Sequence, residues 1–503
     1  MPRMSTPATP RPTSQARDTS PLSILMVASE AFPFAKTGGL ADVTTSLCDA
    51  LAVAGHDVTL VMPRYLGVEV ESPIVRRTAV RMGSRWFDVG FGVHALDSGA
   101  RVVFVGCDEL YRRDGLYGDA AGDHADNALR FGLLARAAFD YASGMTRAPD
   151  ILHAHDWQAG LVPVYARTRY LGHPRLDGLP TVFTIHNVGY QGIFPASVLP
   201  ALDLPRSLFT IDGLEFWGQS SFLKAGINFC DAVTTVSRTH AREIRTREYG
   251  HGMDGVIRAR ADRLHGILNG IDTDTWDPTN DPHLPAAYSG ADLSGKRDAK
   301  RSLLAQFELP VTRSRLDRPL VGMISRMVYQ KGLDLIAEVM TELPRLGATF
   351  VILGTGEARY QDMWRAAAAR YPDVIRVRIG YDESLAHIIE AGADIFLMPS
   401  RYEPCGLNQM YSMRYGTVPV VRATGGLADV VRPKGEGKEP TGFTFSAYTG
   451  AAMLDALGEA VAAFGDRERW TALQRAGMSR DFSWTASARA YVNLYRRLVA
   501  AST

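Results

Sequence analysis

The heptapeptide Thr-Gly-Gly-Leu-Ala-Asp-Val occurs twice in this chain of 503 residues, at residues 37–43 and again at residues 424–430. Each copy follows an apolar run, residues 24–28 or 418–421, so each predicts a strand, a glycine turn and the start of a helix. Glycines permit close backbone approach, and the free N–H groups at a helix start attract anions. The repeat predicts two lobes that close on one phosphorylated ligand. For either copy, a mere tight connection between strand and helix is the alternative.

The residue before the repeat differs between the two copies. Lys36 precedes the first copy, whereas Ala423 precedes the second. An ammonium group beside exposed N–H groups favours phosphate, so Lys36, Gly38 and Gly39 are predicted to contact it. The second copy is predicted to complete the phosphate pocket from behind, through Thr424, Gly425 and Gly426.

Composition places the chain among globular proteins with two large domains, because 503 residues exceed one ordinary core. A net charge of +1, without any block of Lys and Arg, argues against nucleic acid or an anionic membrane as partner. No apolar run is long enough to span a membrane. The four cysteines, Cys48, Cys107, Cys230 and Cys405, show no paired spacing. They predict a reducing cytoplasm and neither disulfides nor a zinc site.

Apolar runs alternate with helical stretches along most of the chain, which predicts an α/β fold with two doubly wound parallel sheets. Glycines interrupt this pattern within residues 245–258, where the chain is expected to cross between lobes. The predicted lobes are residues 22–248 and residues 249–483, with a strand at residues 264–268 assigned to the second.

The two ends of the chain leave alternatives open. Residues 1–21 are rich in Pro, Ser, Thr and Arg and are expected to form a disordered leader, with an organelle transit peptide as the alternative. The amphipathic segment 484–503 predicts a final helix. That helix either caps the second lobe or crosses back to the first.

Two loops of the second lobe carry groups suited to a diphosphate and to sugar hydroxyls. Arg326 and Lys331 follow a predicted strand and provide two fixed positive charges for a diphosphate, with solvated loop charges as the alternative. Glu403 lies before Gly406, which opens a helix, so a carboxylate and free N–H groups face one crevice. Cys405 is interpreted as a packed or ligand-lining thiol, because no His and Asp partners for a nucleophile are evident.

Polar and aromatic side chains follow two successive strands of the first lobe. The segments 153–158 and 184–192 have the sequences His-Ala-His-Asp-Trp-Gln and Thr-Ile-His-Asn-Val-Gly-Tyr-Gln-Gly. A metal site is disfavoured, because the His-x-His pair would need a third ligand on the same strand face. A sugar pocket fits better, lined by Asp156, Trp157, His186, Asn187 and Tyr190.

Taken together, these motifs resemble those of the bacterial and plant-type glycogen and starch synthases, which are retaining glucosyltransferases of the GT-B fold. The resemblance runs from about residue 22 to residue 497. Its anchors are the segments 36–40, 153–157, 186–187, 269–272, 325–326, 330–332, 403–406 and 424–427. The implied architecture is two Rossmann-like domains facing across a deep cleft, the first for the glucan acceptor and the second for the nucleotide sugar.

The resemblance implies transfer of glucose from ADP-glucose to the non-reducing 4-hydroxyl of an α-1,4-glucan such as glycogen, with retention of configuration and no metal or other cofactor. Lys36, Arg326 and Lys331 would neutralise the diphosphate, helped by the N–H groups of Gly38, Gly39 and Leu407. Glu403 would bind the hydroxyls of the donor glucose. The other implied contacts are a glucose pocket of Asp156, His186, Asn187 and Asn269, a stack of Tyr381 near the adenine, and a sugar contact by Tyr117.

One position departs from a related pattern. Many retaining GT-B enzymes carry a second Glu eight positions after the first, and Tyr411 occupies that position here. Ribose contacts would therefore come from elsewhere. The competing hypotheses are a GT-B transferase that uses UDP-glucose or a small acceptor, and an inactive glucan-binding protein.

Overall fold

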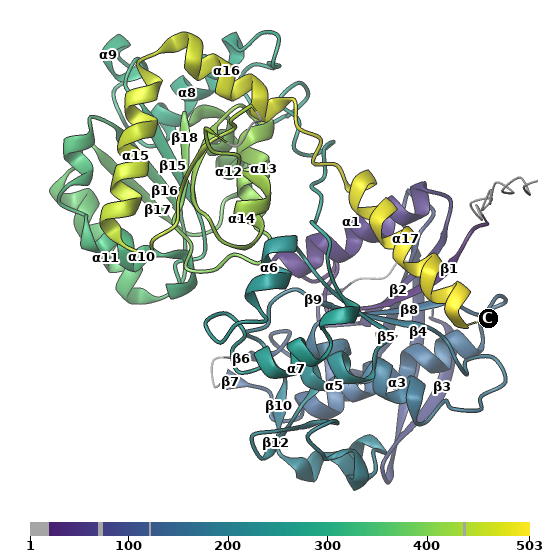
Figure 1. The fold of residues 1–503 in the computed structure, drawn as a ribbon. Coiled ribbons are helices and arrows are strands. Elements are labelled where there is room, and N and C mark those ends of the chain that lie inside the picture. The colour runs from purple at the N-terminus through teal and green to yellow at the C-terminus, as the bar shows by residue number, and fades with distance from the viewer. Residues whose placement is uncertain (1–19, 69–73, 120–121, 436–438, 503) are drawn as a thin grey trace, which may run out of the picture.

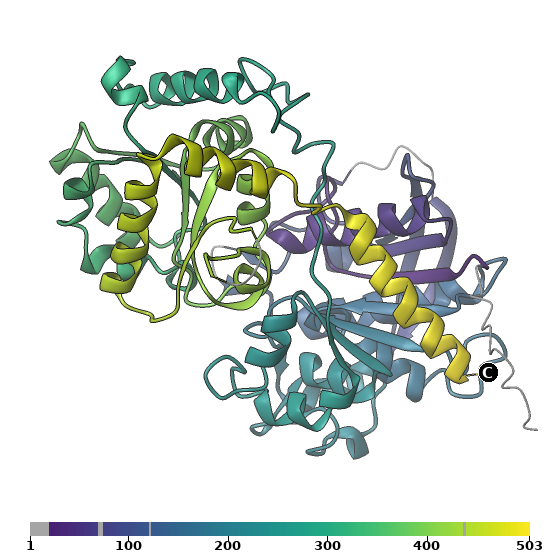
Figure 2. The ribbon, with the colours of Figure 1, turned by 45° about the horizontal axis from the view of Figure 1, so that its top comes forward.

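The computed structural model of the chain describes residues 20–68, 74–119, 122–435 and 439–502. They form two lobes, each built on a sheet covered by helices, and Figures 1 and 2 show the lobes from two directions. Residues 1–19 of the expected leader lie outside the described residues. No helix in the described ranges is long and apolar enough to cross a bilayer.

The first lobe contains a nine-stranded sheet in the order β14-β13-β9-β8-β1-β2-β5-β4-β3. From β14 to β5 every pairing is parallel, and β3 and β4 add an antiparallel hairpin at the edge. The strands are β1 (Ser23–Val27), β2 (Asp57–Pro63), β3 (Ile74–Met82), β4 (Arg85–Ala95), β5 (Arg101–Gly106), β8 (Ile151–His155), β9 (Thr181–Ile185), β13 (Ala232–Thr235) and β14 (Leu264–Gly266). Strands β1, β8 and β9 are buried throughout, as expected for a parallel sheet covered on both faces.

The second lobe contains a six-stranded, fully parallel sheet in the order β17-β16-β15-β18-β19-β20. Its strands are β15 (Leu320–Ile324), β16 (Thr349–Gly354), β17 (Ile375–Ile379), β18 (Ile395–Met398), β19 (Val418–Arg422) and β20 (Phe443–Phe445). Short strands elsewhere are β6 (Gly118–Asp119), β7 (Gly122–Asp123), β10 (Ile193–Phe194), β11 (Glu215–Phe216) and β12 (Gln219–Ser221). The predicted pair of doubly wound sheets is confirmed.

Helices cover both faces of each sheet. Those of the first lobe are α1 (Gly39–Val53), α2 (Asp108–Tyr111), α3 (Asn127–Ser143), α4 (Leu161–Arg167), α5 (Phe222–Phe229), α6 (Arg238–Glu243) and α7 (Asp254–Ala259). Those of the second lobe are α8 (Ser294–Gln306), α9 (Arg313–Leu316), α10 (Leu333–Glu338), α11 (Ala358–Arg370), α12 (Glu383–Gly392), α13 (Asn408–Arg414), α14 (Gly425–Val430), α15 (Gly450–Phe464) and α16 (Arg467–Met478).

The chain leaves the first lobe later than the glycine pattern suggests. Strand β14 pairs in parallel with β13, with Val233 opposite Leu264, and so belongs to the first sheet. The boundary expected at residues 248 and 249 therefore lies ahead of the last strand of that lobe. An apolar strand has the same pattern in either sheet, and only its pairing reveals its lobe.

The last helix, α17 (Trp484–Ser502), crosses back and packs against α1 of the first lobe. Both views show the yellow helix beside the purple one (Figures 1 and 2). Tyr491, Leu494 and Tyr495 are buried in the core of the first lobe. The Tyr495 hydroxyl also lies 2.7 Å from Nδ1 of the buried His153. The first lobe is thus completed by the C-terminal end of the chain.

This packing makes the stability of the first lobe depend on α17. We expect Leu494→Ala to lower the free energy of unfolding by about 2 to 4 kcal/mol, because it leaves a cavity at a fully packed position. The neighbouring exposed residue Asn493 provides the matched control Asn493→Ala on the same helix. Urea unfolding followed by circular dichroism measures both variants. Equal midpoints for the two would contradict the packing of α17 on the first lobe.

Candidate active site

A cavity of about 1490 Å³ lies between the lobes, and its walls are loops that follow strands of both sheets. The predicted site residues that line it are Lys36, Gly38, Gly39, Tyr117, Asp156, Trp157, His186, Asn187, Asn269, Arg326, Lys331, Tyr381, Glu403, Cys405, Gly406 and Leu407. The structure therefore brings nearly the whole predicted set to one cleft. Thr424, Gly425 and Gly426 lie outside its lining.

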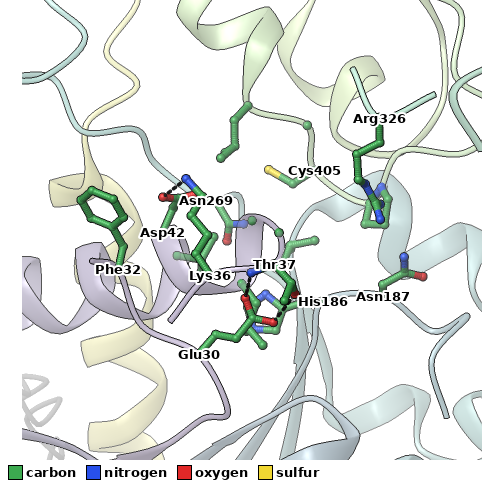
Figure 3. Close-up of a pocket in the computed structure, with 18 of the residues that line it drawn as sticks. Glu30, Phe32, Lys36, Thr37, Asp42, His186, Asn187, Asn269, Arg326 and Cys405 are labelled. Carbon is green, nitrogen blue, oxygen red and sulfur yellow. Dashed lines mark hydrogen bonds and ion pairs between the residues drawn. The ribbon is translucent and has the colours of Figure 1, made fainter. Parts of the chain in front are cut away.

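The first glycine turn is open to the cavity. A Cβ atom added at Gly38 or Gly39 would meet no described atom within 4 Å. Gly38 is the N-cap residue of α1 and has no side chain to accept the N–H groups of the first turn. The ammonium of Lys36 lies beside this turn, paired with Asp42 at 2.8 Å (Figure 3). An anion in the cavity can therefore reach both the charge and the backbone donors.

Glu30 is a cavity residue that the sequence analysis did not identify. Its carboxylate accepts hydrogen bonds from the backbone N–H and the hydroxyl of Thr37, both at 2.6 Å (Figure 3). The Tyr117 hydroxyl donates to the same carboxylate at 2.5 Å. Glu30 follows β1 at the carboxyl end of the sheet, where ligands bind in open α/β folds. This position in the sequence could have identified Glu30 as a site residue. Glu30 fixes the turn that carries Lys36.

In the second lobe, Lys331 and Glu403 form an ion pair with 2.6 Å between Nζ and Oε2. The carboxylate side chain is 7% exposed and also accepts the Ser400 hydroxyl at 3.0 Å. Two partners hold Glu403 in one orientation at the carboxyl end of β18. Arg326 faces the same cavity, on the loop after β15 (Figure 3). This wall thus presents two cations and one oriented carboxylate.

Cys405 lines the cavity as a protonated thiol. Burial raises the pKa of Cys405 to about 12, although a backbone hydrogen bond at Asn269 lowers it. A thiol with this pKa is a poor nucleophile at neutral pH. Asn269 lies close by, and its Oδ1 is buried without a hydrogen-bond partner among the described residues. These two groups fit a ligand-lining role better than covalent catalysis.

The second glycine turn differs from the first, and the expectation that Thr424, Gly425 and Gly426 line the ligand pocket is corrected here. A Cβ atom at Gly425 would lie 1.9 Å from the Glu403 carbonyl oxygen, and one at Gly426 would lie 2.0 Å from that of Cys405. These glycines allow two backbone segments to touch. Their N–H groups are occupied by protein, so no phosphate can approach them.

The loops after β8 and β9 bring Asp156 and His186 together. Oδ1 of Asp156 accepts the backbone N–H of His186 at 2.7 Å. Asp156 has a φ of 54°, a left-handed backbone conformation that is uncommon outside glycine and often found at functional sites. Burial raises the pKa of Asp156 to about 7, although backbone N–H groups of His186 and Asn187 lower it.

A buried histidine group lies behind this wall. Nδ1 of His155 is 3.0 Å from Nε2 of His186, so Nδ1 of His186 is the ring nitrogen that a ligand would meet. Nε2 of His153 lies 2.6 Å from the hydroxyl of Thr184. Burial lowers the pKa of His153 and of His186 to about 3, so both rings are neutral at physiological pH. The pair His153 and His155 thus serves the packing and orientation of His186.

Aromatic residues border the cavity. Trp157 packs against Phe131 with the ring centroids 5.0 Å apart, and Tyr117 lies next to it. Tyr381 is 76% exposed, and its hydroxyl donates to Glu383 at 2.5 Å. Exposed rings of this kind offer flat faces to a sugar or a base.

Comparisons with known proteins agree with this geometry. Residues 23–259 match the family described as starch synthase catalytic domain, and residues 306–473 match glycosyl transferases group 1. The glycogen synthase of Koribacter versatilis is 46% identical over 486 residues, covering 95% of this chain and 98% of the relative. That of Myxococcus xanthus is 47% identical over 484 residues, covering 95% of this chain and 100% of the relative.

Two solved structures resemble this chain over most of its length. The catalytic domain of starch synthase IV from Arabidopsis thaliana, bound to ADP and acarbose, superposes with a TM-score of 0.87 at 35% identity, covering 96% of this chain and 100% of that one. Sucrose-phosphate synthase from Thermosynechococcus elongatus shares the fold, with a TM-score of 0.61 at 18% identity, covering 95% of this chain and 99% of that one. The chain has the GT-B fold and belongs to the glycogen and starch synthase family of glucosyltransferases.

Proposed function

We propose that this enzyme transfers glucose from ADP-glucose to the non-reducing 4-hydroxyl of an α-1,4-glucan such as glycogen, with retention of anomeric configuration and release of ADP. One observation carries the proposal. Fixed cations from both lobes, Lys36 on one side and Arg326 with Lys331 on the other, line a single cavity. The related starch synthase IV binds ADP and acarbose in its solved structure, which supports the same ligand classes here.

The proposed reaction separates charge, because the diphosphate leaves while the sugar gains oxocarbenium character. Cations and helix starts that already point at the leaving group lower this barrier without reorganising. Lys36, Arg326 and Lys331 would carry that role, with N–H groups of Gly38, Gly39 and Leu407. In this scheme the acceptor attacks from the face that the diphosphate leaves, and a covalent intermediate is the alternative route to retention.

The remaining cavity residues would bind sugar and base. Glu403, oriented by Lys331 and Ser400, would accept hydroxyl groups of the donor glucose. A carboxylate beside the sugar also favours the developing positive charge. The other proposed contacts are a glucose pocket of Asp156, His186, Asn187, Asn269 and Cys405, a stack of Tyr381 on the adenine, and sugar contacts by Trp157 and Tyr117.

A cytoplasmic location fits the cysteines. Cys48, Cys107, Cys230 and Cys405 are all buried free thiols. Thiols without disulfide partners are typical of a reducing compartment. We therefore extend the proposal to a cytoplasmic glucan-synthesising enzyme.

Lys36 gives the sharpest test of the charge argument. We expect Lys36→Ala to lower kcat with ADP-glucose and glycogen by about a hundredfold, because one fixed cation at the leaving group is lost. Its ion pair with Asp42 is partly exposed, so the free energy of unfolding should change by less than about 1 kcal/mol. The exposed Lys434 provides the control Lys434→Ala, which should keep normal turnover. Equal kcat for wild type and Lys36→Ala would refute the role of Lys36.

The nucleotide preference is tested by the rates of nucleotide release from ADP-glucose and UDP-glucose with the same glycogen. We expect kcat/KM to be at least about tenfold higher for ADP-glucose, which corresponds to about 1.4 kcal/mol of differential transition-state binding. A higher value for UDP-glucose would overturn the donor assignment. Release of neither nucleotide would favour an inactive glucan-binding protein.

The buried Asp156 makes stability depend on pH. Its folded-state pKa of about 7 lies above the ordinary value of 3.8. The folded state therefore holds the proton more tightly, and the stability gained from this group is fully present below pH 3.8 and lost as the pH rises through 7. We expect the free energy of unfolding of wild type minus that of Asp156→Asn to fall between pH 5 and pH 8.

Urea unfolding of both proteins at half-unit pH intervals measures this difference. Titrating groups far from Asp156 contribute equally to both proteins and cancel. A difference that stays constant, or that rises with pH, would contradict the raised pKa of Asp156.

A further inference from the structure

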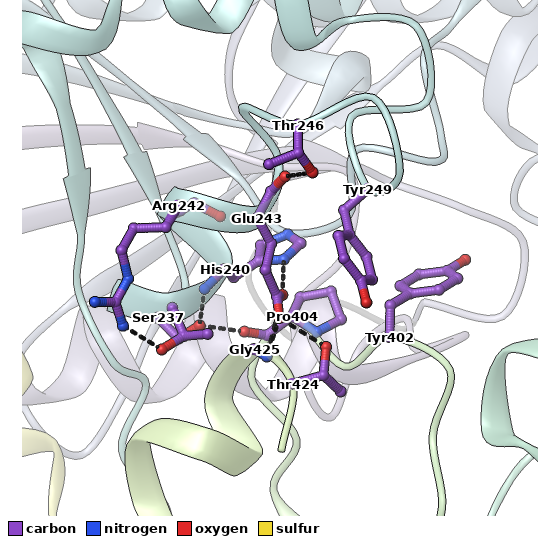
Figure 4. Close-up of polar contacts among 12 residues, drawn as sticks. Ser237, His240, Arg242, Glu243, Thr246, Tyr249, Tyr402, Pro404, Thr424 and Gly425 are labelled. Carbon is purple, nitrogen blue, oxygen red and sulfur yellow. Dashed lines mark hydrogen bonds and ion pairs between the residues drawn. The ribbon is translucent and has the colours of Figure 1, made fainter. Parts of the chain in front are cut away.

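The second copy of the repeated heptapeptide lies in the contact between the lobes. Helix α6 of the first lobe packs on α14 of the second, and Figure 4 shows the polar groups between them. The Ser237 hydroxyl donates to the Pro404 carbonyl oxygen at 2.6 Å. The backbone N–H and the hydroxyl of Thr239 donate to the Asp429 carboxylate at 2.9 and 2.7 Å. These bonds join α6 directly to the loop and the helix next to Glu403.

Glu243, the last residue of α6, occupies the start of α14. Its Oε1 accepts the Thr424 hydroxyl at 2.8 Å and the Gly425 N–H at 3.0 Å, and its Oε2 lies 3.1 Å from the same nitrogen (Figure 4). The Glu243 side chain is only 14% exposed. A carboxylate from one lobe thus takes the position at this helix start that an anionic ligand could otherwise occupy.

The start of α14 is in rigid contact with the backbone of Glu403. The Gly426 N–H donates to the carbonyl oxygen of Glu403 at 3.0 Å and lies 3.2 Å from that of Pro404. At Gly425, which has a φ of 46°, not even a Cβ atom fits against the Glu403 carbonyl. With no space between these segments, a displacement of the Gly425 peptide displaces the backbone of Glu403.

We propose that Glu243 is a positioning residue for the active site, which sets the place of Glu403 through the first turn of α14. Lys331 and Ser400 hold the carboxylate of Glu403 from within the second lobe. Glu243 holds its backbone from the first lobe, so the direction of Glu403 depends on how the lobes are arranged. Among the described residues, Glu243 is not part of the lining of the ligand cavity, and it acts through Gly425.

This inference rests on the proposed function, because its readout is glucosyl transfer. We expect Glu243→Ala to lower kcat by about tenfold, as a small misplacement of a reacting group does, while KM for ADP-glucose and the Kd of ADP change less than twofold. The cations that bind the diphosphate are not touched by the substitution. Glu243→Gln keeps an acceptor oxygen for Gly425 and Thr424 and should retain at least about half of the wild-type kcat.

Asp429→Ala is the matched control. It removes two other hydrogen bonds between α6 and α14, both made by a side chain a turn away from the Gly425 peptide. We expect its kcat to stay within twofold of wild type. A loss of kcat as large as that of Glu243→Ala would reduce Glu243 to a general contact between lobes and overturn the proposal, as would a normal kcat in Glu243→Ala.

A second pair of variants covers the case in which Glu243→Ala does not fold. Thr424→Val removes one donor to Glu243 and should lower kcat about threefold, whereas Thr424→Ser keeps the hydroxyl and should restore it. Equal rates for the two variants would overturn the proposal. Wild-type protein is assayed alongside: no transfer by wild type would refute the proposed function, whereas normal transfer with unaffected variants would refute only the role of Glu243.

Discussion

The ligand cavity depends on one constraint, that the carboxyl ends of the parallel strands of both sheets face the same cleft. Parallel strands return through helices, so the loops at their carboxyl ends are free to carry function while the strands stay buried. Here the loops after β1, β8 and β9 form one wall, and those after β15 and β18 form the other. Charges fixed to different lobes can then act on one diphosphate. The helix α17 adds to this arrangement by tying the C-terminal end to the first lobe.

The repeated heptapeptide illustrates how surroundings decide the use of a motif. Both copies build a strand, a glycine turn and a helix start. At the first copy Glu30 binds Thr37 and leaves Gly38 and Gly39 open to the cavity. At the second copy Glu243 binds the helix start, and the glycines serve close backbone packing. The first copy presents a binding surface for an anion, and the second contacts the backbone of Glu403.

The fold class and most of the cavity could be predicted from sequence because both are local signals. Buried parallel strands read as continuous apolar runs, and the loops that follow them carried Lys36, Arg326, Lys331 and Glu403. The sheet to which β14 belongs could not be predicted, because a short apolar run has the same sequence pattern whichever strand it pairs with. The hairpin β3 and β4 was likewise not anticipated, since it is a half-exposed addition at an edge.

The roles of Glu30 and Glu243, whose carboxylates bind the two glycine turns, could not be predicted from the neighbouring sequence either. Glu243 lies on a short helix distant in sequence from Gly425, and nothing in its neighbours indicates that it reaches the other lobe. The same holds for the corrected role of Thr424, Gly425 and Gly426. A glycine that allows contact with backbone and one that allows contact with a ligand look identical in a sequence. Only the assembled fold separates them.

The central claim is that cations from both lobes act on one leaving diphosphate. A crystal structure of this protein with ADP tests it most directly. The account predicts that the diphosphate oxygens lie within hydrogen-bond distance of Lys36 from the first lobe and of Arg326 and Lys331 from the second. An ADP molecule whose diphosphate contacts only one lobe, or that binds outside this cavity, would contradict it.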